Sequence, residues 1–225
     1  TFAMVPQIIV KPRFFTPAND TITVRALYND KAVALLLEWD DRTKSIPGDD
    51  KAKSIADVEL TEDAIAVQFP MKITAGMEKP YFLMGDAAKP VNPWRWSSGT
   101  TDYPASITLL DATGIDAQEA RDANGLTAKA DYKDGTWRVV MTRALTTDQA
   151  DKDLQFQEGR FIPIAFFAWD GSNSEAGSRH AMTTWYWLLL KPSTGARPII
   201  GAIIAFFLIC GLLFWWNRSA GRSAS

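Results

Sequence analysis

The sequence predicts a mainly β protein, an antiparallel β-sandwich of the immunoglobulin-like or a related type, followed by one C-terminal helix. Short runs of β-branched, aromatic and alternating apolar residues recur along residues 1–190, and turn residues separate them. Helical periodicity is scarce in that part of the chain. The exception to the β pattern is a long uncharged stretch near the C-terminus.

Two hairpins are expected from turn residues between β-type runs. Residues 21–28 (TITVRALY) and 32–39 (AVALLLEW) flank an Asn-Asp-Lys turn. Residues 126–132 and 137–143 flank Lys-Asp-Gly-Thr, in which the Asp-Gly pair supplies the backbone freedom that a tight hairpin needs.

Other elements follow from apolar pattern and composition. Residues 64–69 (AIAVQF) alternate and stop at a proline, and residues 161–169 (FIPIAFFAW) are a continuous apolar run typical of a strand buried on both faces. A last strand is expected at 185–190, and residues 115–121 are the only plausible short helix. Residues 81–103 are rich in Gly, Pro, Trp and Ser, which predicts a long structured loop.

The C-terminal stretch has the composition of a membrane helix. Residues 198–216 (PIIGAIIAFFLICGLLFWW) carry no charge. As a helix they would span roughly 28 Å, close to the ~30 Å hydrocarbon core of a bilayer. Trp215 and Trp216 stand where the chain would meet the headgroups, and Arg218 follows them. A single transmembrane anchor in the lipid bilayer is therefore expected.

This pattern predicts a β-sandwich domain at 1–190, a linker at 191–197, the transmembrane helix at 198–216 and a short tail at 217–225. Basic residues flank the span equally, so the positive-inside rule leaves its orientation undecided. The first residue, Thr1, is not Met, which suggests a removed leader. We expect a single-pass protein of the inner (cytoplasmic) membrane, with the N-terminal domain periplasmic and the C-terminus cytoplasmic.

The charges of the chain are unevenly placed. From Lys191 onward there are four of the 24 basic residues and none of the 26 acidic ones, so residues 1–190 carry a formal net charge of −6. An acidic domain lacks the basic face that nucleic-acid binding requires. Nucleic acid is therefore excluded as a partner.

Cysteine and histidine are nearly absent. Cys210 is the only cysteine, which excludes an intrachain disulfide, an iron–sulfur cluster, a thiolate zinc site and the Cys-x-x-Cys-His pattern of covalently attached c-type haem. His180 is the only histidine, so multi-histidine metal sites are impossible and a His-based triad would have to use it. The nine Trp and twelve Phe instead suit a large apolar pocket or interface.

Two segments carry candidate binding residues. In residues 81–96 (YFLMGDAAKPVNPWRW), Met84 precedes Gly-Asp and opens an aromatic loop that could wall a planar ligand, although a buried methionine is more often a core gap-filler. In residues 168–181 (AWDGSNSEAGSRHA), a polar loop returns through Arg179 and His180, although a lone histidine is more often a satisfied core or surface residue.

A third segment closes the strand expected at 32–39. Its paired carboxylates, Asp40 and Asp41, could indicate a metal site or an acid/base pair. Adjacent residues on a strand face opposite ways, which favours a solvated turn instead.

Met84 and His180 can be interpreted together. They are the two residue types that most often take opposite faces of a six-coordinate haem iron in electron-transfer cytochromes. Aromatic residues would line the pocket, and basic residues could neutralise the propionates. The aromatic candidates are Trp94, Trp96 and Trp169, and the basic ones are Arg179, Lys89 and Arg95.

Four stretches carry a resemblance to a known family. They are RALYNDKAVALLLEWDDRT, MGDAAKPVNPWRW, GTWRVVMTRAL and GRFIPIAFFAWDGSNSEAGSRHAMTTWYWLLL, and the resemblance extends from about Thr21 to Leu190. They resemble the haem b-binding domain of the ethylbenzene dehydrogenase and dimethylsulfide dehydrogenase γ-subunit family. The resemblance implies a β-sandwich that holds one non-covalent haem b and passes electrons for a molybdenum-containing enzyme.

The resemblance also implies the haem ligands. The methionine of Met-Gly-Asp is an axial ligand in that family, which carries over to Met84. The other ligand is a lysine after Trp-Asp-Gly-Ser-Asn, but this sequence has Arg179-His180 in that stretch and no lysine. We expect His180 to take its place, since imidazole binds haem iron well. The C-terminal membrane helix is a second departure, since the family members compared are soluble.

The leading hypothesis is a membrane-anchored electron-transfer subunit that binds haem b through Met84 and His180 and transforms no substrate itself. Its partners would be other subunits of a membrane-bound redox complex, namely a molybdoenzyme complex, a respiratory complex or a photosynthetic complex. The alternative is a cofactor-free structural or assembly subunit of a large respiratory or photosynthetic membrane complex that keeps the fold. A free-standing enzyme is disfavoured because no nucleophile–base pair or metal cluster can be assembled from the sequence.

Overall fold

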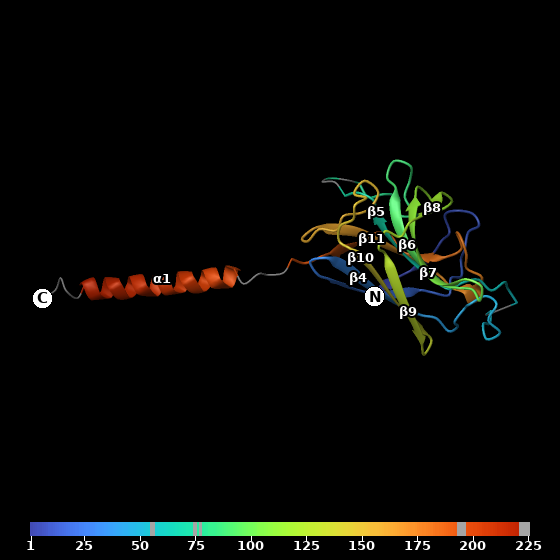
Figure 1. The fold of residues 1–225 in the computed structure, drawn as a ribbon, viewed down its shortest axis with the longest axis horizontal. Helices are drawn as coiled ribbons and strands as arrows, with labels where there is room; N and C mark the ends of the chain where they lie inside the picture. Colours follow the sequence, from blue (N-terminus) through green and yellow to red (C-terminus); the bar gives the residue numbers. More distant parts are fainter. Residues whose placement is uncertain (55–56, 74–75, 77, 193–196, 221–225) are drawn as a thin grey trace. The chain divides into compact units, whose positions relative to one another are not determined.

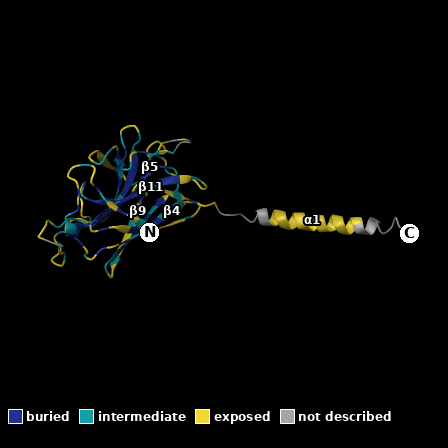
Figure 2. Cartoon of the chain, turned by 180° about the vertical axis from the view of Figure 1, so that it is seen from behind, coloured by how far each residue is buried: buried dark blue, intermediate teal, exposed yellow. Residues whose placement is uncertain are grey.

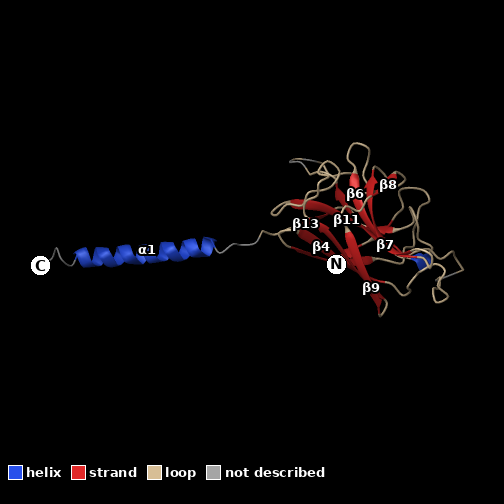
Figure 3. Cartoon of the chain, viewed as in Figure 1, coloured by secondary structure: helices blue, strands red, loops and turns tan. Residues whose placement is uncertain are grey.

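The computed structural model describes residues 1–54, 57–73, 76, 78–192 and 197–220, and for α1 it describes the side chains of residues 200–216. The chain divides into two compact units, Thr1–Leu190 and Lys191–Ser225. The first unit holds every described strand and the second holds the long helix, α1 (Arg197–Ala220). Figure 3 shows the strands of the first unit in red and its connections in tan.

The first unit is built from two antiparallel sheets, as predicted. The smaller sheet has five strands, in the order β1 (Phe2–Ala3), β3 (Thr21–Tyr28), β4 (Ala32–Asp40), β10 (Thr136–Ala144) and β9 (Thr127–Lys133). The larger sheet has the order β2 (Val5–Pro6), β12 (Ala181–Met182), β11 (Phe161–Trp169), β5 (Ala64–Pro70), β6 (Val91–Gly99), β7 (Pro104–Ala112) and β8 (Gln118–Arg121). One further strand, β13 (Tyr186–Leu189), pairs with β11 (Figure 1).

Both predicted hairpins are present. In the β3–β4 hairpin the Oδ1 of Asn29 accepts hydrogen bonds from the backbone N–H groups of Lys31 and Ala32, at 2.9 Å each. In the β9–β10 hairpin Asp134 and Gly135 have φ values of 53° and 73°, and a two-residue hairpin turn of type I′ requires positive φ at both of its central residues. Local turn chemistry therefore decides the pairing of these strands.

Two expectations about secondary structure are wrong. The loop expected over 81–103 contains β6, whose alternating Trp-Arg-Trp follows the period of a strand although its Gly and Pro residues suggest a loop. Residues 115–121, expected as a helix, contain the edge strand β8. Its backbone groups pair with β7, and Arg121 forms an ion pair with Asp111 across the two strands at 2.7 Å.

The predicted C-terminal helix is present as α1. Within the described residues, however, no helix combines the length and the apolar character needed to cross a membrane, and the transmembrane span predicted over residues 198–216 is not found. Parts of the predicted linker and tail, residues 193–196 and 221–225, lie outside the described residues.

The two faces of the larger sheet are both buried at its centre. On β5 the side chains of Ile65, Val67 and Phe69 face the core between the sheets, whereas Ala64 and Ala66 face the opposite side. That opposite side carries a second cluster, here called the outer cluster, which consists of Ala64, Ala66, Leu83, Met84, Val91, Ala112, Phe167, Trp169 and Met182. Figure 2 shows β5 and β11 in the colour of buried residues.

A buried ion pair fastens the loop after β10 to the edge of the larger sheet. The Arg121 guanidinium bonds to the Asp153 carboxylate, which also accepts hydrogen bonds from Asn124 and Thr147, at 2.7 Å each. The Asp153 side chain is fully buried. Burial by itself would raise its pKa, but the bonds from Arg121, Thr147 and Asn124 together hold the pKa of Asp153 below its ordinary value.

Asp153→Asn should destabilise the full chain by ~3 kcal/mol at pH 7, because it leaves the charge of Arg121 partly unpaired in a buried place. Since the folded pKa of Asp153 lies below its unfolded value of about 3.9, its contribution is complete above that pH and is lost as the pH falls through the folded pKa. The difference in urea unfolding between wild type and variant should therefore shrink from pH 7 to pH 3. The exposed Asp151→Asn serves as control, and a difference of equal size at both pH values would contradict the assignment.

Candidate functional site

Met84 sits at a tight bend that turns its side chain into the outer cluster. Met84 and Gly85 both adopt left-handed backbone, with φ values of 61° and 76°. A Cβ on Gly85 would lie 2.9 Å from the carbonyl oxygen of Lys89, so the bend needs glycine there. Asp86 closes the bend by accepting hydrogen bonds from the N–H groups of Ala88 and Lys89 at 2.9 and 3.0 Å. The Met-Gly-Asp motif thus buries the Met84 sulfur, and the side chain is 1% exposed.

His180 is fully buried at the end of the loop that joins β11 to β12. Its Nδ1 lies 3.0 Å from the carbonyl oxygen of Gly177, which places the proton on Nδ1 and leaves the lone pair of Nε2 free. Nε2 is buried without a hydrogen-bond partner among the described residues. Burial lowers the pKa of His180 to about 4, although the bond to Gly177 opposes this, so the ring is neutral at pH 7.

The structure brings Met84, His180 and Trp169 to one face of the larger sheet. Met84 and Trp169 both belong to the outer cluster. The imidazole of His180 packs against Phe167 and Trp169 of β11, with ring centroids 5.4 and 5.1 Å apart. Met84 and His180 therefore lie on the same side of the larger sheet as the rings of Phe167 and Trp169.

Trp94 and Trp96 lie on the other face of the sheet, away from Met84. Both belong to the core between the two sheets, where Trp96 packs against Trp137 with ring centroids 4.9 Å apart. The expectation that all three tryptophans line one pocket therefore fails for Trp94 and Trp96. Residues 94 and 96 share a face of β6, and it is Arg95 between them that points to the outer side.

Arg95 is the basic residue beside the outer cluster. Its guanidinium carbon lies 5.5 Å from the centre of a Trp169 ring. Burial lowers the pKa of Arg95, against the weaker effect of Glu62. Within the described ranges Arg95 forms no ion pair, so its charge is available to an anionic group.

The other two basic candidates are engaged elsewhere. The Arg179 guanidinium lies over the ring of Phe14, 5.2 Å from its centroid. The ammonium of Lys89 forms an ion pair with Glu78 at 2.6 Å. Although Arg179 is next to His180 in the sequence, its charge is directed at a different aromatic ring.

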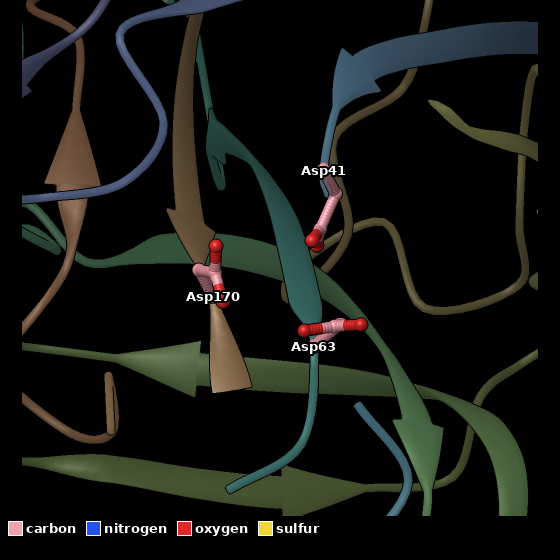
Figure 4. Close-up of side chains that lie close together, drawn as sticks. All are labelled: Asp41, Asp63 and Asp170. Atoms are coloured by element: carbon pink, nitrogen blue, oxygen red, sulfur yellow. The ribbon is translucent and has the colours of Figure 1, made fainter. Parts of the chain in front are cut away.

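A group of three carboxylates lies at one end of the sandwich. Asp41 follows β4, Asp63 precedes β5 and Asp170 follows β11, and Figure 4 shows their side chains gathered between these strand ends. One carboxylate oxygen of each lies within 4.8 Å of the others, and all three residues are buried. The interpretation of Asp40 and Asp41 as a solvated turn is thus wrong for Asp41, which is 3% exposed.

Backbone and indole N–H groups hold Asp63 in place. Its carboxylate accepts hydrogen bonds from Ser45 N at 2.7 Å, Gly171 N at 2.9 Å and Trp137 Nε1 at 3.0 Å. Because these donors come from the loop after β4, from the loop after β11 and from β10, Asp63 connects the two sheets. The geometry around it is therefore fixed by parts of the chain far apart in sequence.

The three carboxylates have no cationic partner within the described part of the chain. Burial, and after it the charges of Asp63 and Asp170, raise the pKa of Asp41 to about 8. Burial also raises the pKa of Asp63 to about 6, although its hydrogen bonds oppose the change. Such a cluster must take up protons or a cation, since three adjacent buried negative charges repel one another strongly.

Gly171 allows the close approach of chain segments that builds this cluster. A Cβ at Gly171 would lie 2.0 Å from the carbonyl oxygen of Thr61 and 2.7 Å from the Cβ of Ser45. Ser45 and Thr61 both belong to the connection between β4 and β5, which also carries Asp63. A larger residue at position 171 would therefore push this connection away from the end of β11.

Gly171→Ala should therefore destabilise the protein by ~3 kcal/mol through overpacking. The matched control is Gly125→Ala in a remote turn, where a Cβ meets nothing within 4 Å but the φ of 76° costs about 1 kcal/mol for alanine. Urea unfolding of both variants measures the difference. An equal loss of stability in the two variants would contradict the prediction, because it would show that the chain around Gly171 can move to accommodate a Cβ.

Curated relatives are similar over most of this chain. It is 28% identical over 185 residues to a putative respiratory nitrate reductase heme subunit, ORF7, of Haloferax mediterranei, covering 80% of this chain and 59% of that one. It is 29% identical to the chlorate reductase subunit gamma of Ideonella dechloratans, covering 77% and 66%. It is 25% identical to the dimethylsulfide dehydrogenase subunit gamma of Rhodovulum sulfidophilum, covering 86% and 69%. The matched part thus spans about 60–70% of the length of these relatives.

Solved structures show a weaker similarity. A family 9 carbohydrate-binding module of Caldicellulosiruptor kristjanssonii in complex with glucose matches at 13% identity and a TM-score of 0.41, covering 86% of this chain and 76% of that one. The same module with cellotriose matches at 13% identity and a TM-score of 0.42, covering 88% and 75%.

The family model described as ethylbenzene dehydrogenase matches residues 1–125 and 106–181, which together make up most of the chain. This match and the curated relatives confirm the resemblance that the sequence motifs indicate, and the chain belongs to the ethylbenzene dehydrogenase family.

Proposed function

We propose that the chain is a non-catalytic electron-transfer subunit of a redox complex and that it holds one non-covalent haem b, with Met84 and His180 as axial ligands. The observation that carries the proposal is the Nε2 of His180, a fully buried ring nitrogen without a partner among the described residues. The names of the relatives support it, since one is a heme subunit and two are gamma subunits of oxidoreductases.

The two side chains suit haem ligation because neither has to lose a proton first. A thioether is neutral at any pH, and the lowered pKa of His180 keeps its imidazole neutral. The bond from Nδ1 to Gly177 orients the ring, as a second partner does for most metal-binding histidines. A haem bound there would supply one-electron redox chemistry at its iron. The residues of this chain would set its potential through ligand type and burial.

The surroundings suit a flat, anionic group. Ala64 and Ala66 present small side chains on the same sheet face as Trp169. Arg95, beside Trp169, has no ion-pair partner among the described residues and offers its guanidinium to a propionate carboxylate. With Cys210 as the only cysteine, the two thioether links of a c-type haem cannot form, which favours b-type binding.

The partner in this proposal is a molybdenum-containing oxidoreductase subunit, with other subunits of the same complex. An outer-sphere electron carrier transforms no substrate and must contact both a donor and an acceptor. We propose that the β-sandwich does this in the periplasm, as expected from the sequence.

A second candidate function is that of a structural subunit without a cofactor. It is favoured by the packing, because Phe167 and Trp169 lie directly against His180 and the Met84 side chain is already buried. In that case side chains, rather than a porphyrin, would occupy the space between the two proposed ligands.

Absorption spectroscopy of the full chain from haem-replete cells distinguishes the two. We expect a Soret band whose chromophore is extracted by acid acetone, as for b-type haem. Met84→Leu keeps the apolar volume but removes the sulfur, so it should shift the Soret band and the midpoint potential.

The matched control for this test is Met182→Leu, another buried methionine of the outer cluster, which should leave the spectrum unchanged. His180→Ala should abolish the low-spin spectrum. A folded but colourless protein, as judged by circular dichroism, would overturn the haem proposal and favour the structural subunit.

A further inference from the structure

We propose that Asp41, Asp63 and Asp170, together with Asn19, form a calcium-binding site at the end of the sandwich. This site is separate from Met84 and His180 and does not depend on the proposed electron-transfer role. The spacing of the carboxylates, the buried amide of Asn19 and the chemistry of the ligand atoms all support such a site.

The carboxylates are spaced for one ion. An oxygen from each aspartate lies within 4.8 Å of the others. Two ligands on opposite sides of a calcium ion, each at about 2.4 Å, are themselves about 4.8 Å apart. Three oxygens within that limit are therefore close enough together to serve as ligands of one ion.

The buried amide of Asn19 is a second indication of a bound cation, independent of the acidic cluster. It is 3% exposed, and both its Oδ1 and its Nδ2 are buried without a hydrogen-bond partner among the residues that the structure describes. It lines a cavity of about 690 Å³ together with Asp41 and Asp170. A buried amide without a partner is costly, and a cation bound by its oxygen would satisfy it.

Asn19 is also held in position. The N–H of the preceding residue, Ala18, donates to a carboxylate oxygen of the buried Glu175 at 2.8 Å, and the carbonyl of the following residue, Asp20, accepts from Met4 N at 2.7 Å. The backbone on both sides of Asn19 is therefore fixed. A ligand atom on a fixed backbone loses little conformational freedom when an ion binds.

Asp41 offers a free oxygen as well. Its Oδ1 accepts from Thr43 N at 3.0 Å, whereas its Oδ2 is buried and has no partner in the described part of the chain. Asp170 uses one oxygen, Oδ1, to accept from the N–H and the hydroxyl of Ser172 at 2.8 and 2.6 Å. The hydrogen bonds thus orient the carboxylates and still leave oxygen capacity for a cation.

The donor set selects the class of ion. All the candidate metal ligands are carboxylate or amide oxygens, which favour hard cations over zinc or copper. Calcium accepts six to eight oxygens in irregular geometry, and the adjoining cavity can supply water for the remaining positions. Magnesium requires a near-ideal octahedron and gives up its water reluctantly, so several anionic protein ligands at one point favour calcium.

A bound ion would join the two sheets. Asp41 follows a strand of the smaller sheet, whereas Asp63 and Asp170 adjoin two strands of the larger one. The ion would also neutralise the repulsion among the three charges. Binding to the folded chain alone must then raise its melting temperature in proportion to the logarithm of the calcium concentration.

The test uses the full chain after treatment with EDTA. Millimolar CaCl2 should raise the Tm by about 5 °C or more, and the same concentration of MgCl2 should raise it less. Asp41→Asn and Asp170→Asn should remove the calcium-dependent shift while leaving the calcium-free protein folded, because they relieve charge repulsion. The matched control is Asp40→Asn, which lines the same cavity but lies outside the cluster, and it should retain the shift.

A terbium titration provides a second readout at the site. Because the Trp137 indole N–H bonds directly to Asp63 at 3.0 Å, excitation of tryptophan should sensitise the emission of Tb³⁺ bound there, and calcium should displace it. Asn19→Ala removes a neutral ligand and should weaken terbium binding about tenfold.

No Tm shift and no sensitised emission with folded protein would overturn the site. A calcium shift that persists in both Asp41→Asn and Asp170→Asn would also overturn it, because the ion would then bind elsewhere. Since neither readout involves haem, a colourless protein that binds calcium would defeat the proposed function and leave the calcium site standing.

Discussion

The structure depends on burying both faces of the central strands of the larger sheet. β5 and β11 send alternate side chains into the core between the sheets and into the outer cluster, so loops must cover the face that a simple sandwich leaves in water. Those loops carry Met84 and His180. The aromatic residues of the outer face, Phe167 and Trp169, pack against the ring of His180 and belong to the same cluster as Met84, so they help to hold both side chains away from solvent.

This arrangement also buries the polar groups on which the two proposed sites depend. His180 is neutral because it is buried, and the carbonyl of Gly177 fixes the proton on Nδ1, so that Nε2, which has no partner in the described residues, carries the lone pair. Asp41 and Asp63 are buried where chain segments cross the strand ends, with N–H donors but no nearby cation in the described residues. Native proteins seldom keep such unmatched groups in the interior unless a ligand satisfies them.

The sequence predicts strands better than it predicts which face a residue occupies. The hairpins and the strand at 161–169 follow from turn residues and apolar runs, and the structure confirms them. Trp94 and Trp96 were expected beside Met84 because all three lie in one segment, but the period of β6 sends both tryptophans into the inner core. Composition describes a segment as a whole, whereas alternation decides the environment of each residue.

The same alternation contains the signal for the acidic cluster. On β4 the residues 33, 35, 37 and 39 face the core, and Asp41 continues that row, whereas its neighbour Asp40 faces water. Asp63 and Asp170 continue the inward rows of β5 and β11 beyond the pair Ala64–Trp169, whose own side chains face the outer cluster. The end of the β5–β11 ladder thus carries residues of both proposed sites: Trp169 faces the outer cluster, and the next residue on each strand, Asp63 or Asp170, faces the other way. A shift of one residue in the register of these two strands would turn the aspartates outward and Trp169 inward. The pairing of β5 with β11 therefore determines the position of both proposed sites.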